Sequence, residues 1–158
     1  MKFLIRQKIF SIGEKFTIKD EQDKDCYQVK GAIFTLAKKL ELLDMQEQTL
    51  ISIRQKLFAF MPEYFLLKGE EQVARIKQKF AFLKPKFEIT GVNGTYSMEG
   101  NFLAYDFTLV KEGTVAATVS KKFFSFTDSY GVEVAQGEDP AFILALVIVI
   151  DQVIHPTR

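Results

Sequence analysis

Cations recur at every second position in one segment of the chain, at Arg75, Lys77 and Lys79. No acidic residue occurs between residues 72 and 87. Because alternate side chains of a β-strand lie on one face, these cations would form a row about 13 Å long. A row of that length is suited to binding phosphate groups. The alternative is an ordinary solvated strand face, whose charges only discourage pairing with another strand edge.

Further basic residues are candidates for the same site, because they lie in stretches of related sequence and would extend the row. Each cation near an anionic leaflet contributes about 1 kcal/mol, and salt screens much of this attraction. The predicted site for an anionic headgroup therefore consists of Arg75, Lys77, Lys79, Arg54, Lys56 and Lys122.

Residues suited to catalysis or metal binding are sparse. The single histidine, His155, precedes a proline near a helix end, where we expect an exposed residue whose positive charge is mildly favourable. The acidic residues of 20–25 resemble a calcium loop only superficially, since the sixth position is not glycine and Gly31 stands at the twelfth. The stretch 91–94 has the chemistry of a hairpin and lacks the spacing of a phosphate loop. We therefore expect a non-enzymatic protein with no catalytic residue, metal or cofactor.

Composition indicates the cellular setting. The formal net charge is +1, so there is no global attraction to nucleic acid, which is not a predicted partner. Residues 1–6 hold too few apolar residues for a signal peptide. The one cysteine, Cys26, cannot form an internal disulfide and is expected to be a packed or edge thiol in a reducing compartment. We expect a cytoplasmic protein, free or peripheral to a membrane, whose partner is an anionic membrane surface or a protein.

The residues 141–150, all apolar, are the strongest indication of architecture. Asp139 and Pro140 are a helix start signal, and His155-Pro156 is a stop signal. A helix over 140–154 would be about 22 Å long, and its apolar character on all sides predicts burial on all sides. It falls short of the roughly 20 residues that cross a bilayer, which leaves a short tail anchor as an alternative. Its β-branched residues leave a strand as another.

The rest of the chain has the pattern of short strands. Turn signals separate runs rich in Val, Ile, Thr, Tyr and Phe, and Asn93-Gly94 is the strongest hairpin signal among them. Counting the runs predicts about twelve strands, between about residues 2 and 136, joined as an antiparallel meander. A chain of 158 residues with no linker composition is expected to form one domain over 1–158.

An internal repeat decides one ambiguous segment. Apolar residues of 33–43, including Ile33, fall at helical spacing. However, Phe16-Thr17-Ile18 recurs as Phe87-Glu88-Ile89, and the stretch 55–60 recurs as 121–126, which includes Phe124, Ser125 and Phe126. This alignment pairs 36–44 with 104–111, where apolar and polar residues alternate, so we predict a strand in both. The pseudo-repeats span about 5–67 and 74–134.

The helix and the strands fit together by size. A closed sheet of twelve tilted strands has a backbone diameter of roughly 24 Å. After inward side chains are subtracted, the remaining space is about the 10–12 Å diameter of one helix. The predicted fold is therefore mainly β, a closed antiparallel barrel of about twelve strands around a buried C-terminal α-helix.

Several motifs resemble the LURP-one-related family, and the chain is identified as a bacterial member on that resemblance. The motifs are Lys38-Lys39-Leu40-Glu41-Leu42-Leu43-Asp44-Met45, Ile53-Arg54-Gln55-Lys56-Leu57, Pro62-Glu63-Tyr64 and the apolar terminal helix. The resemblance implies the tubby C-terminal-like fold, which is also proposed for phospholipid scramblases. Tubby relatives bind phosphoinositide headgroups through basic residues, but no matching lipid-binding motif carries those residues onto this chain.

Two classes of function follow. The first is a non-enzymatic cytoplasmic binding or scaffold module that recognises an anionic phospholipid headgroup or a protein partner through the barrel exterior. The second is a small-molecule carrier or enzyme with a pocket at the barrel mouth. The second class predicts a cavity beside the helix ends, lined by convergent polar groups.

Overall fold

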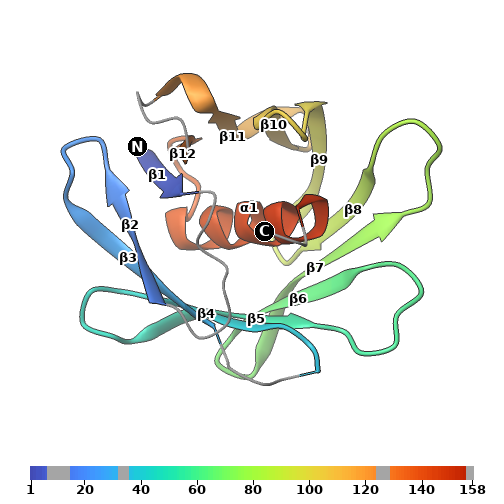
Figure 1. Ribbon diagram of the computed structural model, residues 1–158, viewed down its shortest axis with the longest axis horizontal. Coiled ribbons are helices and arrows are strands. Elements are labelled where there is room, and N and C mark those ends of the chain that lie inside the picture. Colours follow the sequence, from blue (N-terminus) through green and yellow to red (C-terminus); the bar gives the residue numbers. More distant parts are fainter. Residues whose placement is uncertain (7–14, 32–35, 124–128, 156–158) are drawn as a thin grey trace.

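The computed structural model describes residues 1–6, 15–31, 36–123 and 129–155. Figure 1 shows a ring of strands around a single helix. The strands are β1 (Lys2–Arg6), β2 (Lys15–Asp20), β3 (Asp25–Gly31), β4 (Lys39–Leu43), β5 (Thr49–Gln55), β6 (Glu63–Lys68), β7 (Glu71–Lys79), β8 (Lys86–Gly91), β9 (Gly94–Asn101), β10 (Asp106–Lys111), β11 (Thr114–Ser120) and β12 (Ser129–Val134). A 3₁₀ helix, η1 (Lys121–Phe123), precedes β12, and the α-helix is α1 (Pro140–Ile154).

The sheet is a closed antiparallel meander. Each strand pairs with the next one in the chain, and β1 pairs with both β2 and β12. The register that closes the ring places Lys2 opposite Glu133 and Phe3 opposite Val132. The predicted fold, a closed barrel of twelve strands around a C-terminal helix, is confirmed.

The helix begins where its sequence signals indicate. The carboxylate of Asp139 accepts a hydrogen bond from the backbone N–H of Ala141 at 3.1 Å, and Pro140 has no backbone N–H that would need an acceptor in the first turn. Every residue of α1 from Ala141 to Gln152 is buried. The barrel, rather than lipid, therefore surrounds the apolar stretch. Within the described residues, no helix combines the length and apolarity needed to cross a bilayer.

Alternate residues along each strand point into the barrel and form its interior. On β5, Ile51 and Ile53 are fully buried while Ser52 and Arg54 are half-buried on the outer face. The inward side chains of the strands join those of α1 in one hydrophobic core. Burial of such side chains stabilises each by about 1.5–3 kcal/mol, so filling the barrel with its own helix is strongly favourable.

The ambiguous segment is a strand. β4 occupies Lys39–Leu43, and Leu36, which precedes it, is 92% exposed, so the helical spacing of apolar residues does not produce a helix there. Ile33 lies outside the described residues, as do Phe124, Ser125, Phe126 and Pro156. The internal repeat itself remains a prediction.

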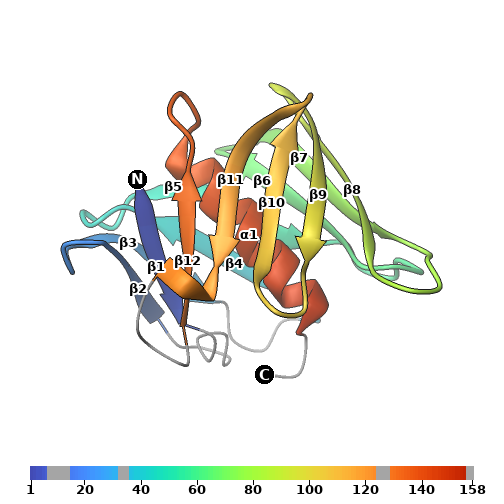
Figure 2. The ribbon, with the colours of Figure 1, turned by 90° about the horizontal axis from the view of Figure 1, so that it is seen from above.

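Connections alternate between two ends of the barrel because successive strands run in opposite directions. One end, here called the loop end, carries the last turn of α1, η1 and the connections 36–38, 56–62, 80–85 and 102–105. The opposite end, the turn end, carries the connections 21–24, 44–48, 69–70, 92–93, 112–113 and 135–139. In Figure 2 the loop end is the lower one and the turn end is the upper one.

Candidate functional site

The predicted basic row lies on the outer face of β7. Arg75 and Lys77 are half-buried and Lys79 is exposed, while Ala74, directly before the row, and Ile76, between its first two cations, are buried in the core. The period-two arrangement inferred from the sequence is therefore present. Its surroundings determine whether these cations are available to a ligand.

Carboxylates of neighbouring strands pair with most of this row. The Arg75 Nε donates to Glu63 Oε2 of β6 at 2.8 Å, and Lys79 Nζ lies 2.8 Å from Glu88 Oε2 of β8. Lys77 lies between the same two carboxylates, because the strand register places it opposite both Glu63 and Glu88. The row is thus interleaved with acidic residues, which weakens its attraction for anions.

The electrostatic effects within these pairs agree with the geometry. The hydrogen bond from Arg75 holds the pKa of Glu63 below its usual value despite the burial of that carboxyl, and it raises the pKa of Arg75. The bond from Lys79 lowers the pKa of Glu88 in the same way. These charges therefore stabilise strand pairing on the outer face of β6–β8.

The proposed extensions of the row behave differently from one another. Arg54 is ion-paired with Glu41 of β4 and lies on the same outer face, and Lys56 Nζ is 4.0 Å from Glu63 Oε1. Lys122 lies in η1, between β11 and β12, and three strands separate β11 from β7 in the ring. The expectation that Lys122 continues the row is wrong, because η1 follows β11, which lies on a different part of the closed barrel from β7.

A stronger separation of charge exists between the two ends of the barrel. The loop-end connections contain no acidic residue among their described positions, and their five basic residues are Lys38, Lys56, Lys84, Lys121 and Lys122. The turn-end connections contain one basic residue, Lys24, and eight acidic ones, Glu21, Asp23, Asp44, Glu47, Glu70, Glu112, Glu138 and Asp139. Four of these acids form ion pairs with strand lysines: Asp23 with Lys19, Glu47 with Lys15, Glu138 with Lys111 and Asp139 with Lys68. The molecule is therefore polarised along the direction that joins its two ends.

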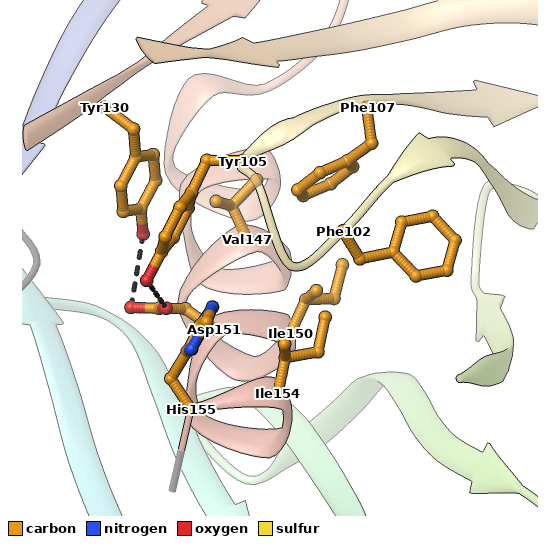
Figure 3. Close-up of a pocket in the computed structure, with 9 residues that line it drawn as sticks. All are labelled: Phe102, Tyr105, Phe107, Tyr130, Val147, Ile150, Asp151, Ile154 and His155. Atoms are coloured by element: carbon orange, nitrogen blue, oxygen red, sulfur yellow. Dashed lines mark hydrogen bonds between the residues drawn. The ribbon is translucent and has the colours of Figure 1, made fainter. Parts of the chain in front are cut away.

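A buried polar cluster closes the interior at the loop end. The hydroxyl of Tyr105 donates to Asp151 Oδ1 at 2.8 Å, and that of Tyr130 reaches Asp151 Oδ2 at 3.4 Å (Figure 3). The imidazole of His155 stacks on the Tyr105 ring with centroids 4.9 Å apart. The expectation that His155 is exposed is therefore wrong: it is half-buried, because its backbone N–H caps the helix through the Asp151 carbonyl and sets the side chain against Tyr105.

The cavity beside this cluster is too small for a metabolite. Its volume is about 10 Å³, which is roughly the space for the centre of one water molecule. Next to it, Lys38 Nζ donates to Gln152 Oε1 at 2.8 Å, and burial lowers the pKa of Lys38. These polar groups bond to one another, so the arrangement fastens the end of α1 to the surrounding loops.

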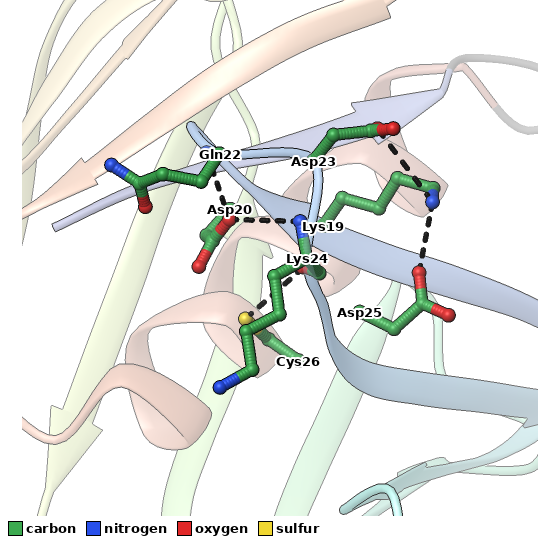
Figure 4. Close-up of polar contacts among 7 residues, drawn as sticks. All are labelled: Lys19, Asp20, Gln22, Asp23, Lys24, Asp25 and Cys26. Carbon is green, nitrogen blue, oxygen red and sulfur yellow. Dashed lines mark hydrogen bonds and ion pairs between the residues drawn. The ribbon is translucent and has the colours of Figure 1, made fainter.

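The acidic stretch 20–25 forms the β2–β3 turn (Figure 4). Asp20 Oδ1 accepts hydrogen bonds from the backbone N–H groups of Gln22 and Lys24, at 2.9 and 3.0 Å. Lys19 Nζ lies 2.9 Å from Asp25. The carboxylates are therefore used to form the turn, and no group of three or more His, Cys, Asp or Glu among the described residues is arranged to hold a metal ion.

Cys26 lies beside this turn as a half-buried thiol. Its Sγ is 3.4 Å from the Lys24 carbonyl, and burial raises the pKa of the thiol. A raised pKa disfavours the thiolate, which is the reactive form. Cys26 is therefore better explained as a packed thiol than as a nucleophile.

Comparison with known proteins agrees with the architecture described above. The crystal structure of an Arabidopsis thaliana protein superposes on this chain with a TM-score of 0.68 at 19% identity, covering 96% of this chain and 90% of that one. At this identity the likeness shows the fold alone.

Sequence comparison then identifies the family. The family model described as LURP-one-related matches residues 1–151, and the chain belongs to that family. Over 155 residues it is 34% identical to the uncharacterized protein YxjI of Bacillus subtilis (strain 168), covering 98% of this chain and 94% of that relative. The predicted family is confirmed.

Proposed function

We propose that this protein is a non-enzymatic binding module that docks the loop end of its barrel on an anionic phospholipid surface at the cytoplasmic face of a membrane. The observation that supports this most is the separation of charge between the two ends. An anionic surface attracts the loop end, with its five lysines, and repels the acidic turn end. The protein would therefore bind in one orientation.

The electrostatic attraction between these lysines and an anionic leaflet is sufficient for reversible binding. Each lysine close to an anionic leaflet contributes about 1 kcal/mol, and the contribution decreases with salt. Lys84 and Lys122 are exposed on separate connections, so they can approach a flat surface together. The β7 row is a weaker candidate, because Glu63 and Glu88 already partner its cations.

Two alternatives make different predictions. A carrier or enzyme needs a cavity beside a helix end. The cavity near Asp151 has a volume of only about 10 Å³, but an open hollow of about 400 Å³ lies beside the start of α1 and is lined by Lys68, Lys111, Glu138 and Asp139. These four charged groups already form two ion pairs with one another, which favours recognition through the exterior. A protein partner with an acidic surface would also be attracted to the loop end, and it predicts no affinity for protein-free vesicles.

Vesicle flotation tests the proposal. Vesicles of equal parts phosphatidylglycerol and phosphatidylcholine should carry the protein upward at low salt, whereas pure phosphatidylcholine should not. The triple variant Lys56→Glu/Lys84→Glu/Lys122→Glu should lose this binding. The single variant Lys24→Glu, at the turn end, should retain it. Absence of flotation of the native chain at low salt would disprove lipid binding, and loss of binding in Lys77→Glu alone would assign it to the β7 row instead.

A further inference from the structure

Exposed apolar side chains gather at the same end of the barrel as the lysines. Eleven large hydrophobic residues are exposed in the described part of the chain, and eight of them lie in loop-end connections. They are Leu36, Leu57, Phe58, Phe60, Phe80, Phe82, Leu83 and Leu103. Scattered exposed hydrophobics are normal, but a concentration of this kind marks an interaction surface.

Two neighbouring loops carry most of this apolar surface. In the β5–β6 connection, Phe58 and Phe60 are 97% and 95% exposed, and in the β7–β8 connection Phe82 and Leu83 are 92% and 99% exposed. Figure 2 shows the β7–β8 loop projecting outward at the loop end. These side chains therefore extend away from the core that the rest of the chain fills.

Local structure holds the aromatic rings at the loop tips. Phe58 has a φ of 57°, a left-handed conformation that is uncommon for a bulky residue. Phe80 and Phe82 pack edge to face with their ring centroids 5.3 Å apart, which leaves both rings on the surface. Strained backbone conformations cluster at functional sites, so the one at Phe58 supports a role for its exposed ring.

Each of these loops also carries a lysine and no acidic residue. Lys56 is in the same connection as Phe58 and Phe60, and Lys84 follows Leu83 directly. Long basic side chains beside apolar tips suit a membrane interface, where the ammonium groups reach lipid phosphates and the rings enter the acyl boundary. The charge of these loops thus complements an anionic bilayer.

We infer that the loops 56–62 and 80–85 insert their aromatic tips into the interfacial region of an anionic membrane. This inference rests on the proposed function, and it deepens it by naming the segments that enter the lipid. The lysines orient the barrel at the surface, and the phenylalanines hold it there when salt screens the charges.

The absence of tryptophan from the sequence allows a direct test with the full chain. Phe60→Trp and Phe82→Trp each introduce a single reporter at a loop tip, and Val92→Trp places a matched reporter at the turn end, where Val92 is 60% exposed. With vesicles of phosphatidylglycerol and phosphatidylcholine, the two loop reporters should shift to shorter emission wavelengths and be quenched by brominated acyl chains. The Val92→Trp reporter should do neither.

A second variant separates insertion from attraction by charge. Phe60→Ser/Phe82→Ser removes two large apolar groups and should weaken vesicle partitioning by roughly tenfold or more at about 1 M NaCl, where the Debye length is near 3 Å. Both positions are exposed, so its melting temperature should match that of the native chain.

The outcomes distinguish the two proposals. Flotation without a spectral shift at Phe60→Trp and Phe82→Trp would overturn insertion and leave headgroup docking intact. No flotation of the native chain would overturn both, and would direct attention to an acidic protein partner. An equal spectral shift at Val92→Trp would overturn the assignment to the loop end.

Discussion

The phenol of Tyr105 donates a hydrogen bond to the carboxylate of Asp151 across 2.8 Å, which joins the β9–β10 connection to the last turn of the central helix. Asp151 is 3% exposed and directly follows the long apolar stretch of α1. A carboxylate at such depth needs partners, because burying an unpaired charge is costly. Tyr105 and Tyr130 provide two of them.

Replacing Tyr105 by phenylalanine should reduce stability without changing the fold. Hydrogen bonds to charged groups contribute about 1.5–3 kcal/mol, so we expect the free energy of unfolding to fall by about that amount. Urea denaturation of Tyr105→Phe measures the effect. Tyr64→Phe is the control, since it removes a hydroxyl from another buried tyrosine without affecting Asp151; an equal loss in both variants would contradict the role given to the Asp151 bond.

Replacing Leu146 by aspartate should prevent folding. Leu146 is fully buried in the middle of α1, and a lone carboxylate there costs several kcal/mol, comparable with the total stability of a domain. Thermal melting monitored by circular dichroism should show no cooperative transition. Leu83→Asp, at a position 99% exposed, should melt like the native chain. A cooperative melt of Leu146→Asp would show that the barrel does not depend on its helix.

Replacing Gly100 by alanine should be much more damaging than the same change at Gly69. A Cβ at Gly100, where φ is 122°, would lie 2.5 Å from the Asp106 carbonyl oxygen and 2.8 Å from Phe107 Cα. At Gly69, where φ is 60°, a Cβ meets nothing within 4 Å, so only about 1–2 kcal/mol of backbone strain is expected. Denaturation midpoints of the two variants provide the comparison, and equal midpoints would contradict the close packing of β9 against β10.

Removing Arg75 should change how stability depends on pH. Because the folded-state pKa of Glu63 lies below its ordinary value of 4.5, its contribution is present above that pH and is lost as the pH falls through the lower folded value. In Arg75→Ala the pKa of Glu63 rises toward or above its ordinary value, so the loss of stability that Glu63 causes in acid should shrink or disappear. The difference from the native chain should be largest near neutral pH and shrink in acid.

Melting temperatures measured between about pH 3 and pH 7 test this expectation, which rests on the lowered pKa of Glu63. Lys84→Ala is the control, because it removes an exposed cation that does not contribute to the lowered pKa of Glu63. Identical pH profiles for Arg75→Ala and the native chain would show that Glu63 gains no stability from its guanidinium partner.

The fold could be predicted because its strongest determinant is local. The apolar residues 141–150 and the cap formed by Asp139 and Pro140 lie together in the sequence, and burial on every side of such a helix requires a large closed sheet. The segment around Leu36 was the hardest to predict. Its apolar residues have helical spacing, yet β4 begins only at Lys39 and Leu36 lies in the connection before it.

The candidate site was only partly predictable because its electrostatics are non-local. The partners of Arg75 and Lys79 are on β6 and β8, outside the acid-free segment that drew attention to them. The polarity of the barrel was accessible in principle, since a meander assigns alternate connections to opposite ends. Asp151, directly after the apolar stretch, indicated that a buried carboxylate would need partners. Nothing in the sequence identified Tyr105 and Tyr130 as those partners.

Closure of the ring by β1 and β12 has a consequence for synthesis of the chain. Lys2 pairs with Glu133, so β1 is synthesised long before β12, the strand that covers its outer edge. The helix α1, which fills the barrel interior, is translated later still. Contacts so distant in sequence form slowly, and unpaired strand edges stay exposed until they form. The nascent polypeptide should therefore depend on chaperones until α1 has been synthesised.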